Sequence, residues 1–224
     1  ATILATLIAF ASCSKDDDGS TMTGESYDTK VSITDAPIDN ASVSAAVVTI
    51  TDVKVDGVSL EGFTTTTVDL LALQNGTKAT LGNLGLEAGM ISNVSLVLDY
   101  EMDQDGNFPG CFVETADGVK HQLIATTNEI KINDQVEILA SSANEIVIDF
   151  DLRKTIIATA EAGDEFDFVT DAELSSGLRL VNEIEAGTVS GTVNDSENTS
   201  EMIIVYAYEA GTYTAAEAEG QGSS

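Results

Sequence analysis

The sequence predicts an all-β protein: an antiparallel β-sandwich of the Ig-like or prealbumin-like kind, preceded by a short flexible N-terminal tether. Three observations predict this fold. From Lys30 onward, short runs of alternating apolar and polar residues, or of β-branched residues, recur along the chain. Turn residues separate these runs at regular spacing. No long amphipathic helical pattern interrupts them.

Length and composition fit a globular protein with a strongly acidic surface. The 224 residues are enough for one large all-β domain or two small ones, and the 43% hydrophobic content supplies a core. The 38 acidic residues outnumber the nine basic ones, which gives a formal net charge of −29. Such a surface repels phosphate backbones and anionic headgroups, so we expect neither nucleic-acid binding nor polybasic docking to membranes.

Residues 1–12 are expected to be an incomplete signal peptide. They are all apolar or small, and so short a stretch cannot span a hydrocarbon core, which needs roughly 20 residues. The small residues before Cys13 fit a secretory cleavage site. The alternative is a buried strand or helix that begins the domain. Against it, the polar, Gly/Ser-rich segment that follows at 13–29 is typical of a linker.

The sequence FASC, from Phe10 to Cys13, resembles the lipobox of bacterial lipoproteins. In that motif, small residues allow cleavage before a cysteine that receives lipid. Phe10 departs from the usual Leu, Val or Ile. The resemblance implies a mature chain that starts at Cys13 and carries acyl chains, each buried methylene of which contributes about 0.8 kcal/mol to anchoring.

The five residues after Cys13 resemble the lysine-plus-acidic export signal of Bacteroidetes lipoproteins. They are Ser14, Lys15, Asp16, Asp17 and Asp18. In those proteins the signal directs export to the outer face of the outer membrane. The resemblance implies a protein on the extracellular face of the cell surface, held in the outer membrane through its lipid anchor without a membrane-spanning helix.

The first two strands of the body are predicted at 31–37, which ends in a Pro-containing turn, and within 42–57. The apolar residues of the second run change parity along it. The first pair is Val48 and Ile50, and the second pair is Val53 and Val55. This change predicts a β-bulge near Thr51–Asp52, which would let both halves of the strand face the core.

Two later runs, 93–101 and 144–152, each place four apolar side chains on one face, as half-buried antiparallel strands do. Hairpin turns are predicted at Asp105-Gly106 and Asp117-Gly118. The best helix candidate is 154–162, but it is short and β-branched, so a strand is an equal alternative there.

Five segments follow one another in the order seen in the bacterial and archaeal DUF4382 domain, which the chain resembles over 30–186. They are VSITDAPID from residue 31, VDLLAL at 68–73, GLEAGMISNVSLVLD at 85–99, IVIDFDLRKTI at 146–156 and LRLVNEI at 178–184. The resemblance implies a β fold and a cell-surface context. It implies no particular reaction.

Residues 187–224 are expected to belong to a second β-sandwich module, present only in part. GTVSGTVND at 187–195 and MIIVYAYEAGTYT at 202–214 look like two strands and are similar to the start of a carboxypeptidase-regulatory-like domain. Two strands alone do not form a stable sheet. Either they pack on the main domain or they need further strands, and the Gly/Ser-rich ending favours the second alternative.

Four acidic residues on one side of a predicted strand are candidate calcium ligands. They are Asp99, Glu101, Asp103 and Asp105. Calcium takes six to eight oxygen ligands, largely carboxylates of this kind. The helical calcium-loop pattern fails, because Phe112 stands where it needs a bidentate glutamate. The favoured interpretation is an exposed strand face that runs into a turn, and a calcium site is the alternative.

We expect no enzymatic activity. A second acidic cluster at 161–173 offers carboxylate pairs, but any acidic chain offers many. The sequence contains no G-x-S-x-G, H-E-x-x-H, Walker or Cys/His metal-binding pattern. His121 is the sole histidine. If Cys13 is lipidated, Cys111 has no disulfide partner, and we expect it to be a small buried hydrophobe.

The sequence therefore predicts a non-catalytic cell-surface lipoprotein that acts as a structural, adhesive or binding module, with an extracellular glycan or protein as partner. The alternative is a glycan-binding lipoprotein of a polysaccharide-capture system, assisted by calcium. Sugars usually stack on exposed aromatic rings, but the chain has no Trp. The remaining candidates for stacking are Tyr27, Tyr206 and Tyr208. Apart from the lipid on Cys13 and this calcium, no cofactor is expected.

Overall fold

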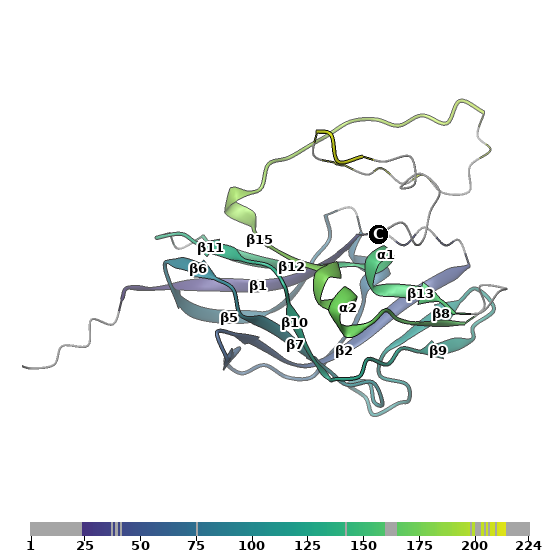
Figure 1. Ribbon diagram of the computed structural model, residues 1–224, viewed down its shortest axis with the longest axis horizontal. Coiled ribbons are helices and arrows are strands. Elements are labelled where there is room, and N and C mark those ends of the chain that lie inside the picture. Colours follow the sequence, from purple (N-terminus) through teal and green to yellow (C-terminus); the bar gives the residue numbers. More distant parts are fainter. Residues whose placement is uncertain are drawn as a thin grey trace, which may run out of the picture.

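The computed structural model describes residues 24–213, apart from 37, 39, 41, 75, 142, 160–164, 198, 200–202, 204, 206 and 209. The predicted signal peptide, Cys13 and the export signal from Ser14 to Asp18 lie outside the described residues. The described part is an all-β, sandwich-like fold, as predicted (Figure 1). It is built from a four-stranded sheet, a seven-stranded sheet and two short ribbons.

The sheets have the following elements. The four-stranded sheet contains β15 (Leu178–Asn182), β12 (Glu145–Asp151), β1 (Ser26–Ala36) and β5 (Ala79–Glu87), in that order. The seven-stranded sheet has the order β10 (Glu129–Ile132), β7 (Val94–Leu98), β2 (Val43–Val55), β8 (Phe112–Thr115) and β9 (Lys120–Gln122), with β3 (Val58–Ser59) and β4 (Thr66–Asp69) also paired to β2. The ribbons are β6 (Gly89–Ile91) with β11 (Val136–Ile138), and β13 (Ile156–Ala158) with β14 (Phe166–Phe168).

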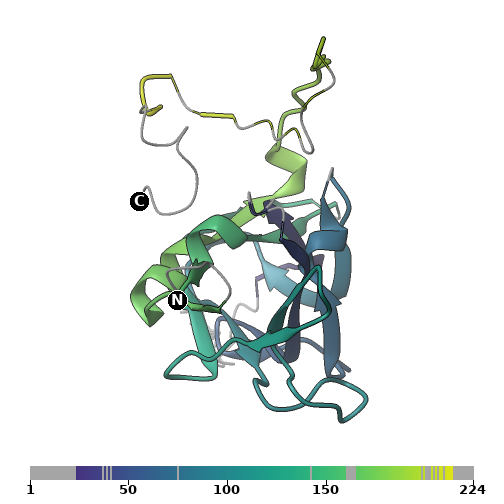
Figure 2. The same ribbon diagram turned by 90° about the vertical axis from the view of Figure 1, so that its right-hand side faces the viewer.

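The helices are short. Two are α-helices, α1 (Leu152–Thr155) and α2 (Asp171–Gly177), and two are 3-10 turns, η1 (Leu70–Leu73) and η2 (Glu183–Glu185). Seen along the strands, the sheets curl around the core, and α1 and α2 lie together on one side of it (Figure 2). Among the described residues, no helix is long and apolar enough to cross a membrane.

Strand β1 joins the beginning of the domain to its end. It is antiparallel to β5 and parallel to β12, where Lys30 to Ala36 pair with Glu145 to Asp151. The prediction of an antiparallel strand at 144–152 therefore holds for the β12–β15 pair and is wrong for the β1–β12 pair. Strand β12 lies in the interior of the sheet, and both of its faces are buried. Val147 points to one face and Ile146 and Ile148 to the other, and all three side chains are buried.

The predicted bulge in β2 is confirmed. Ile50 pairs with Leu98 and Asp52 pairs with Val97, so Thr51 is the extra residue on β2. The change of parity keeps the apolar side chains of both halves in the core. These side chains, Val48, Ile50, Val53 and Val55, are all buried. The bulge lets one long strand contribute to the core along its whole length.

The core lies between the two large sheets. Phe150 is fully buried, and its ring packs at 6.4 Å from that of Phe168. Cys111 is also fully buried, which confirms its predicted role. Its Sγ accepts a hydrogen bond from the Thr49 N–H and donates one to the Asp99 carbonyl. Burial raises the pKa of Cys111 to about 12, so the thiol is unreactive at neutral pH.

Local predictions have mixed outcomes. Asp117-Gly118 joins β8 to β9 as a hairpin, as predicted. Asp105-Gly106 forms a turn, but it lies within a long loop and joins no two strands. The segment 154–162 begins in the last residues of α1 and continues as β13, so neither a helix nor a strand alone describes it. Helix α2 was not predicted from the sequence.

The described residues from 187 to 213 contain no helix or strand. The second module expected at 187–224 therefore stays a prediction.

The loop from Asp99 to Gly110 generates a test of the fold. A methyl group on Gly110 would lie against the backbone oxygens of Asp99 and Met102, closer than real side chains approach. We expect Gly110→Ala to lower the free energy of unfolding by about 1–3 kcal/mol, because overpacking strains the backbone. Urea denaturation measures this. The control, Gly191→Ala, meets no atom within 4 Å, and a similar loss of stability in that variant would contradict the assignment.

Candidate functional site

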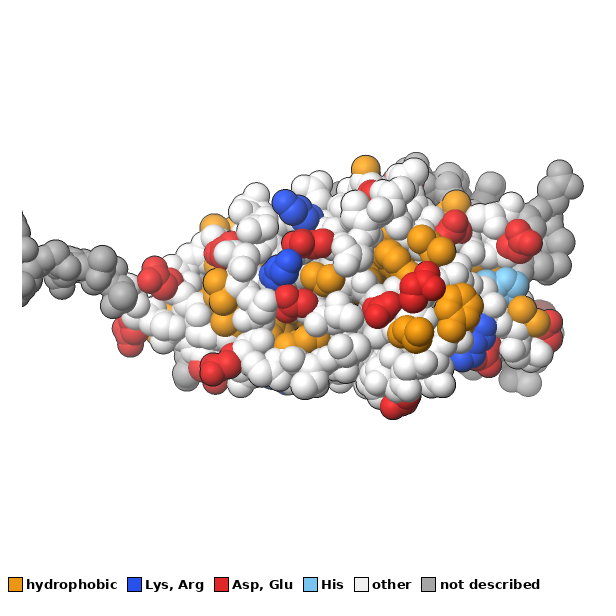
Figure 3. All heavy atoms as spheres, turned by 90° about the horizontal axis from the view of Figure 1, so that it is seen from below, with side chains coloured by type: hydrophobic (Ala, Val, Ile, Leu, Met, Phe, Trp, Pro, Cys, Tyr) orange, Lys and Arg blue, Asp and Glu red, His pale blue; other side chains and the backbone are white. Residues whose placement is uncertain are grey.

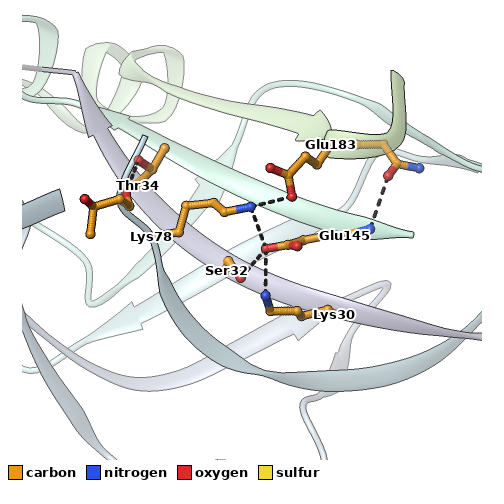
Figure 4. Close-up of polar contacts among 8 residues, drawn as sticks. Lys30, Ser32, Thr34, Lys78, Glu145 and Glu183 are labelled. Atoms are coloured by element: carbon orange, nitrogen blue, oxygen red, sulfur yellow. Dashed lines mark hydrogen bonds and ion pairs between the residues drawn. The ribbon is translucent and has the colours of Figure 1, made fainter. Parts of the chain in front are cut away.

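Two groups of polar side chains on the four-stranded sheet are candidates for a functional role. The first is the Glu145 network, which consists of Lys30, Ser32, Lys78, Glu145 and Glu183 (Figure 4). The second surrounds the buried carboxyl group of Asp35, near the C-terminal ends of β1 and β12.

The Glu145 network centres on one carboxylate oxygen. Ser32 donates a hydrogen bond to Oε1 of Glu145 at 2.7 Å. The ammonium groups of Lys78 and Lys30 lie 3.0 and 3.2 Å from the same oxygen. Lys78 also pairs with Glu183. All four strands of the sheet contribute, because Lys78 directly precedes β5 and Glu183 directly follows β15.

The network keeps Glu145 ionised although its side chain is only 14% exposed. Desolvation by itself would raise the pKa of Glu145. The bonds from Ser32, Lys78 and Lys30 outweigh it and hold the pKa below its usual range. This arrangement is a clamp across the sheet, and every charge in it has an opposite charge beside it.

Asp35 is the exception to this pattern of pairing. It has the same parity on β1 as Val31 and Ile33, the core-facing positions, and it is only 9% exposed. Neither of its carboxyl oxygens has a hydrogen bond of ordinary geometry, and the backbone N–H of Leu152 is the donor that acts on the group. A buried carboxyl group so poorly satisfied is rare in folded proteins, because an unsatisfied polar group is costly.

Three other carboxylates act on Asp35, and each of them has partners of its own. Asp149 pairs with Arg179. Asp151 accepts the Arg153 N–H at 3.2 Å at the start of α1. Asp69 accepts the N–H groups of Leu71 and Ala46, at 3.1 and 3.2 Å.

These surroundings favour the neutral form of Asp35. Burial raises its pKa most, and the carboxylate of Asp149 adds to the rise. The backbone N–H of Leu152 opposes the rise, and Asp151 and Asp69 reinforce it. The resulting pKa is about 9, so Asp35 carries a proton at neutral pH. A buried group with so perturbed a pKa is a candidate functional group, although structural groups are also perturbed in this way.

The acidic residues at 99–105 do not form the strand face that was expected. β7 ends at Leu98, and the chain continues as a loop. Asp99 accepts the N–H groups of Glu101 and Met102, at 2.9 and 3.0 Å. Asp103 accepts those of Asp105 and Asn107, at 2.9 and 2.8 Å. The bonds from Asn107 lower the pKa of Asp103.

These two carboxylates therefore hold the loop in shape. Glu101 and Asp105 are exposed on the same loop. In the part of the chain that the structure describes, no three Asp, Glu, His or Cys side chains are grouped so that they could hold a metal ion. A calcium site formed by Asp99, Glu101, Asp103 and Asp105 stays a prediction, with no support from the geometry.

The aromatic candidates for sugar stacking lie apart. Tyr27 is half-buried and donates to Glu25. Tyr208 packs against Tyr213 with ring centroids 5.3 Å apart. Tyr206 lies outside the described residues. The sequence analysis missed Phe108, which is 61% exposed in the loop after Asn107.

The comparisons with known proteins add a family match. The family model DUF4382, a domain of unknown function, matches residues 28–168. No curated protein and no solved structure matches the chain. Within the matched range, residues 31–36 of VSITDAPID lie in β1 and residues 146–151 of IVIDFDLRKTI lie in β12, so the parallel pair joins two of the segments that carry the resemblance.

The Glu145 network generates a stability test. We expect Glu145→Ala to lower the free energy of unfolding by about 2 kcal/mol near pH 7, because it removes three bonds to a nearly buried charge. Glu183→Ala, at an exposed partner of the same lysine, should cost less than about 1 kcal/mol. Because the folded-state pKa of Glu145 is depressed, its contribution should shrink as the pH falls below about 4. Equal losses in the two variants, measured by urea denaturation, would contradict the assignment.

Asp35 generates a pH test. Its carboxyl titrates near 9 when folded and near 3.9 when unfolded. The folded state therefore binds the extra proton, and the resulting stability is complete below about pH 4 and is lost as the pH rises toward 9. Asp35→Asn cannot titrate. The wild type should lose stability as the pH rises from 4 to 9, and Asp35→Asn should not. The free energy of unfolding of Asp35→Asn minus that of the wild type should therefore increase with pH, by at most about 1.4 kcal/mol per pH unit.

The control for this test is Asp28→Asn, at an exposed position of the same strand. At this exposed position the substitution should change the free energy of unfolding by less than about 0.5 kcal/mol at pH 7. If the stability of Asp35→Asn runs parallel to that of the wild type between pH 4 and 9, Asp35 is ionised in the folded protein and the account of its environment is wrong.

Proposed function

This chain belongs to the DUF4382 family, and from that premise we propose that it is a non-catalytic, lipid-anchored module of the bacterial cell surface, with a structural, adhesive or binding role. The observation that carries the proposal is the lipobox-like FASC from Phe10 to Cys13, followed directly by SKDDD at 14–18. The first segment resembles a lipidation site and the second an export signal of Bacteroidetes lipoproteins. Together the two resemblances support an outer-membrane anchor with the domain on the extracellular side.

The position of β1 supports a tethered domain. The first strand begins at Ser26, at one end of the sandwich (Figure 1). Residues 13–25 would thus separate the lipid-bearing cysteine from the sheet. Fully extended, they reach about 40 Å. A tether of this length lets the sandwich project from a membrane and contact partners beyond it.

The acidic surface supports the same arrangement. Acidic side chains are spread over the face seen in Figure 3, and few basic ones lie among them. With a net charge of −29 over its 224 residues, the chain is repelled by anionic lipid surfaces. We infer that it stands away from the bilayer and does not lie on it, and that the lipid provides the attachment.

The functions of the described polar groups support a non-catalytic role. Glu145 clamps the four-stranded sheet, and Asp99 and Asp103 shape a loop. Asp69 begins η1. These carboxylates serve the fold, which suits a rigid module that presents a surface.

The proposed anchor is tested by expressing the protein from its own gene in its native host. We expect the wild-type protein to partition into the membrane fraction and to carry an acylated N-terminal cysteine by mass spectrometry. Cys13→Ser should lose both properties, because it lacks the thiol that accepts the lipid.

The matched control is the other cysteine. Cys111→Ser replaces a buried thiol by a hydroxyl that can make the same two hydrogen bonds, and it should stay lipidated. An unmodified, fully soluble wild-type protein would contradict the proposed anchor.

A further inference from the structure

A groove between α2 and the edge of the seven-stranded sheet differs in charge from the rest of this acidic protein. Its volume is about 460 Å³. Polar side chains from three separate segments line its rim: Ser92, Asn93, Lys131, Asn133, Ser175 and Ser176. No aspartate or glutamate is among the lining residues, although the chain contains 38 of them.

Two other grooves in the described part of the chain have carboxylates in their walls. One is lined by Glu137 and Glu185, and the other by Asp117 beside His121. An anionic ligand would meet repulsion in both of them. In the groove at α2, by contrast, an anion would meet the Lys131 ammonium group and no carboxylate among the lining residues.

Lys131 forms no close ion pair, although the Glu129 carboxylate on the same strand interacts with it electrostatically. Most other basic residues of the described chain have a partner, such as Glu129 for Lys54 and the Phe112 ring for Lys120. Lys131 and Lys154 have neither an ion pair nor a ring contact among the described residues. Of these two, Lys131 is among the residues that line the groove at α2.

The rest of the rim is also available to a ligand. No hydrogen bond joins the side chains of Ser92, Asn93, Asn133 and Ser175 to another described residue. Their hydroxyl and carboxamide groups both donate and accept hydrogen bonds, as sugar hydroxyls do. Val94 and Ile132 form the floor beneath this rim and are themselves buried.

A peptide strand fits this groove less well than a sugar does. A strand that adds to a sheet needs free backbone groups along the edge. Just beyond β10, the N–H of Asn133 already donates to the Ser175 carbonyl of α2 at 3.0 Å. Helix α2 therefore blocks the addition of a strand to the sheet edge at this point. A ligand in the groove would be recognised by side chains.

We propose that this groove binds an anionic sugar unit, one that carries a carboxylate or a sulfate, with Lys131 pairing with the anion and the serine and asparagine side chains bonding the ring hydroxyls. The inference rests on the proposed role as a binding module and names its site and ligand class. A charge-assisted hydrogen bond from Lys131 provides the preference for acidic over neutral sugars.

The test uses the full chain with Cys13→Ser, which keeps the lipid out of the measurement, and isothermal titration calorimetry. The probes are an oligogalacturonate, a sulfated galactan oligosaccharide, a neutral maltooligosaccharide of the same length and a short acidic peptide. We expect one of the two anionic sugars to bind, and the neutral sugar and the peptide to bind at least tenfold more weakly. The preferred anionic sugar identifies the carboxylate or the sulfate as the group recognised.

The variants localise the site. Lys131→Gln should weaken binding about tenfold or more, since it removes a bond between two charged groups, and Lys131→Arg should restore most of it. Lys154→Gln is the matched control, with the same change in net charge outside the groove, and should bind as the parent does. Circular dichroism confirms that each variant is folded.

Three results would overturn the proposal: equal binding by Lys131→Gln and the parent, tighter binding of the peptide than of either sugar, or no binding of either anionic sugar. None of them bears on the lipid anchor, which is measured separately in cells. Failure of this site and failure of the anchored-module proposal are therefore distinguishable.

Discussion

The parallel pairing of β1 with β12 is the constraint on which the rest of the structure depends. It joins residues far apart in the chain, since Ser32 and the Glu145 carboxylate that it contacts are 113 positions apart. Of the strands between them, β5 pairs with β1 in the same sheet and the others lie in other sheets, and β15 then adds to the outer edge of β12. The same pairing brings the partners of Glu145 together on one face and sets Asp35 near the carboxylates of β12. Such a long-range contact ties the stability of the domain to both ends of its sequence.

Structural features that depend only on the local sequence could be predicted. The change of parity between Ile50 and Val53 revealed the bulge, because a strand that buries both halves must shift its register. The Asp117-Gly118 hairpin followed from turn chemistry. Asp35 carried a usable signal, since it continues the core-facing parity of Val31 and Ile33. Helix α2 was too short for a periodic pattern, yet its capping box, Thr170 with Glu173, is a sequence signature.

Features that depend on distant segments could not be predicted in this way. An alternating run does not record whether its neighbour is parallel, so the direction of the β1–β12 pair was missed. The acidic alternation after Leu98 was taken for a strand face, but Asp99 and Asp103 bond to the backbone of their own loop. The groove at Lys131 draws on segments near 92, 131 and 175, which only the fold brings together. These three places are where tertiary structure overrides local pattern.

The charge distribution connects the fold to the proposed role. Most of the few basic side chains are bound within the sheets, and the acidic surface keeps the domain away from anionic membranes. The central claim is that a rigid domain stands outside the cell on a tether, and protease treatment of intact native cells tests it most directly. We predict rapid release of a soluble fragment that starts between residues 14 and 25 and retains β1 through β15, while a lipidated N-terminal peptide stays in the membrane. Protection in intact cells, with cleavage only after lysis, would contradict the account.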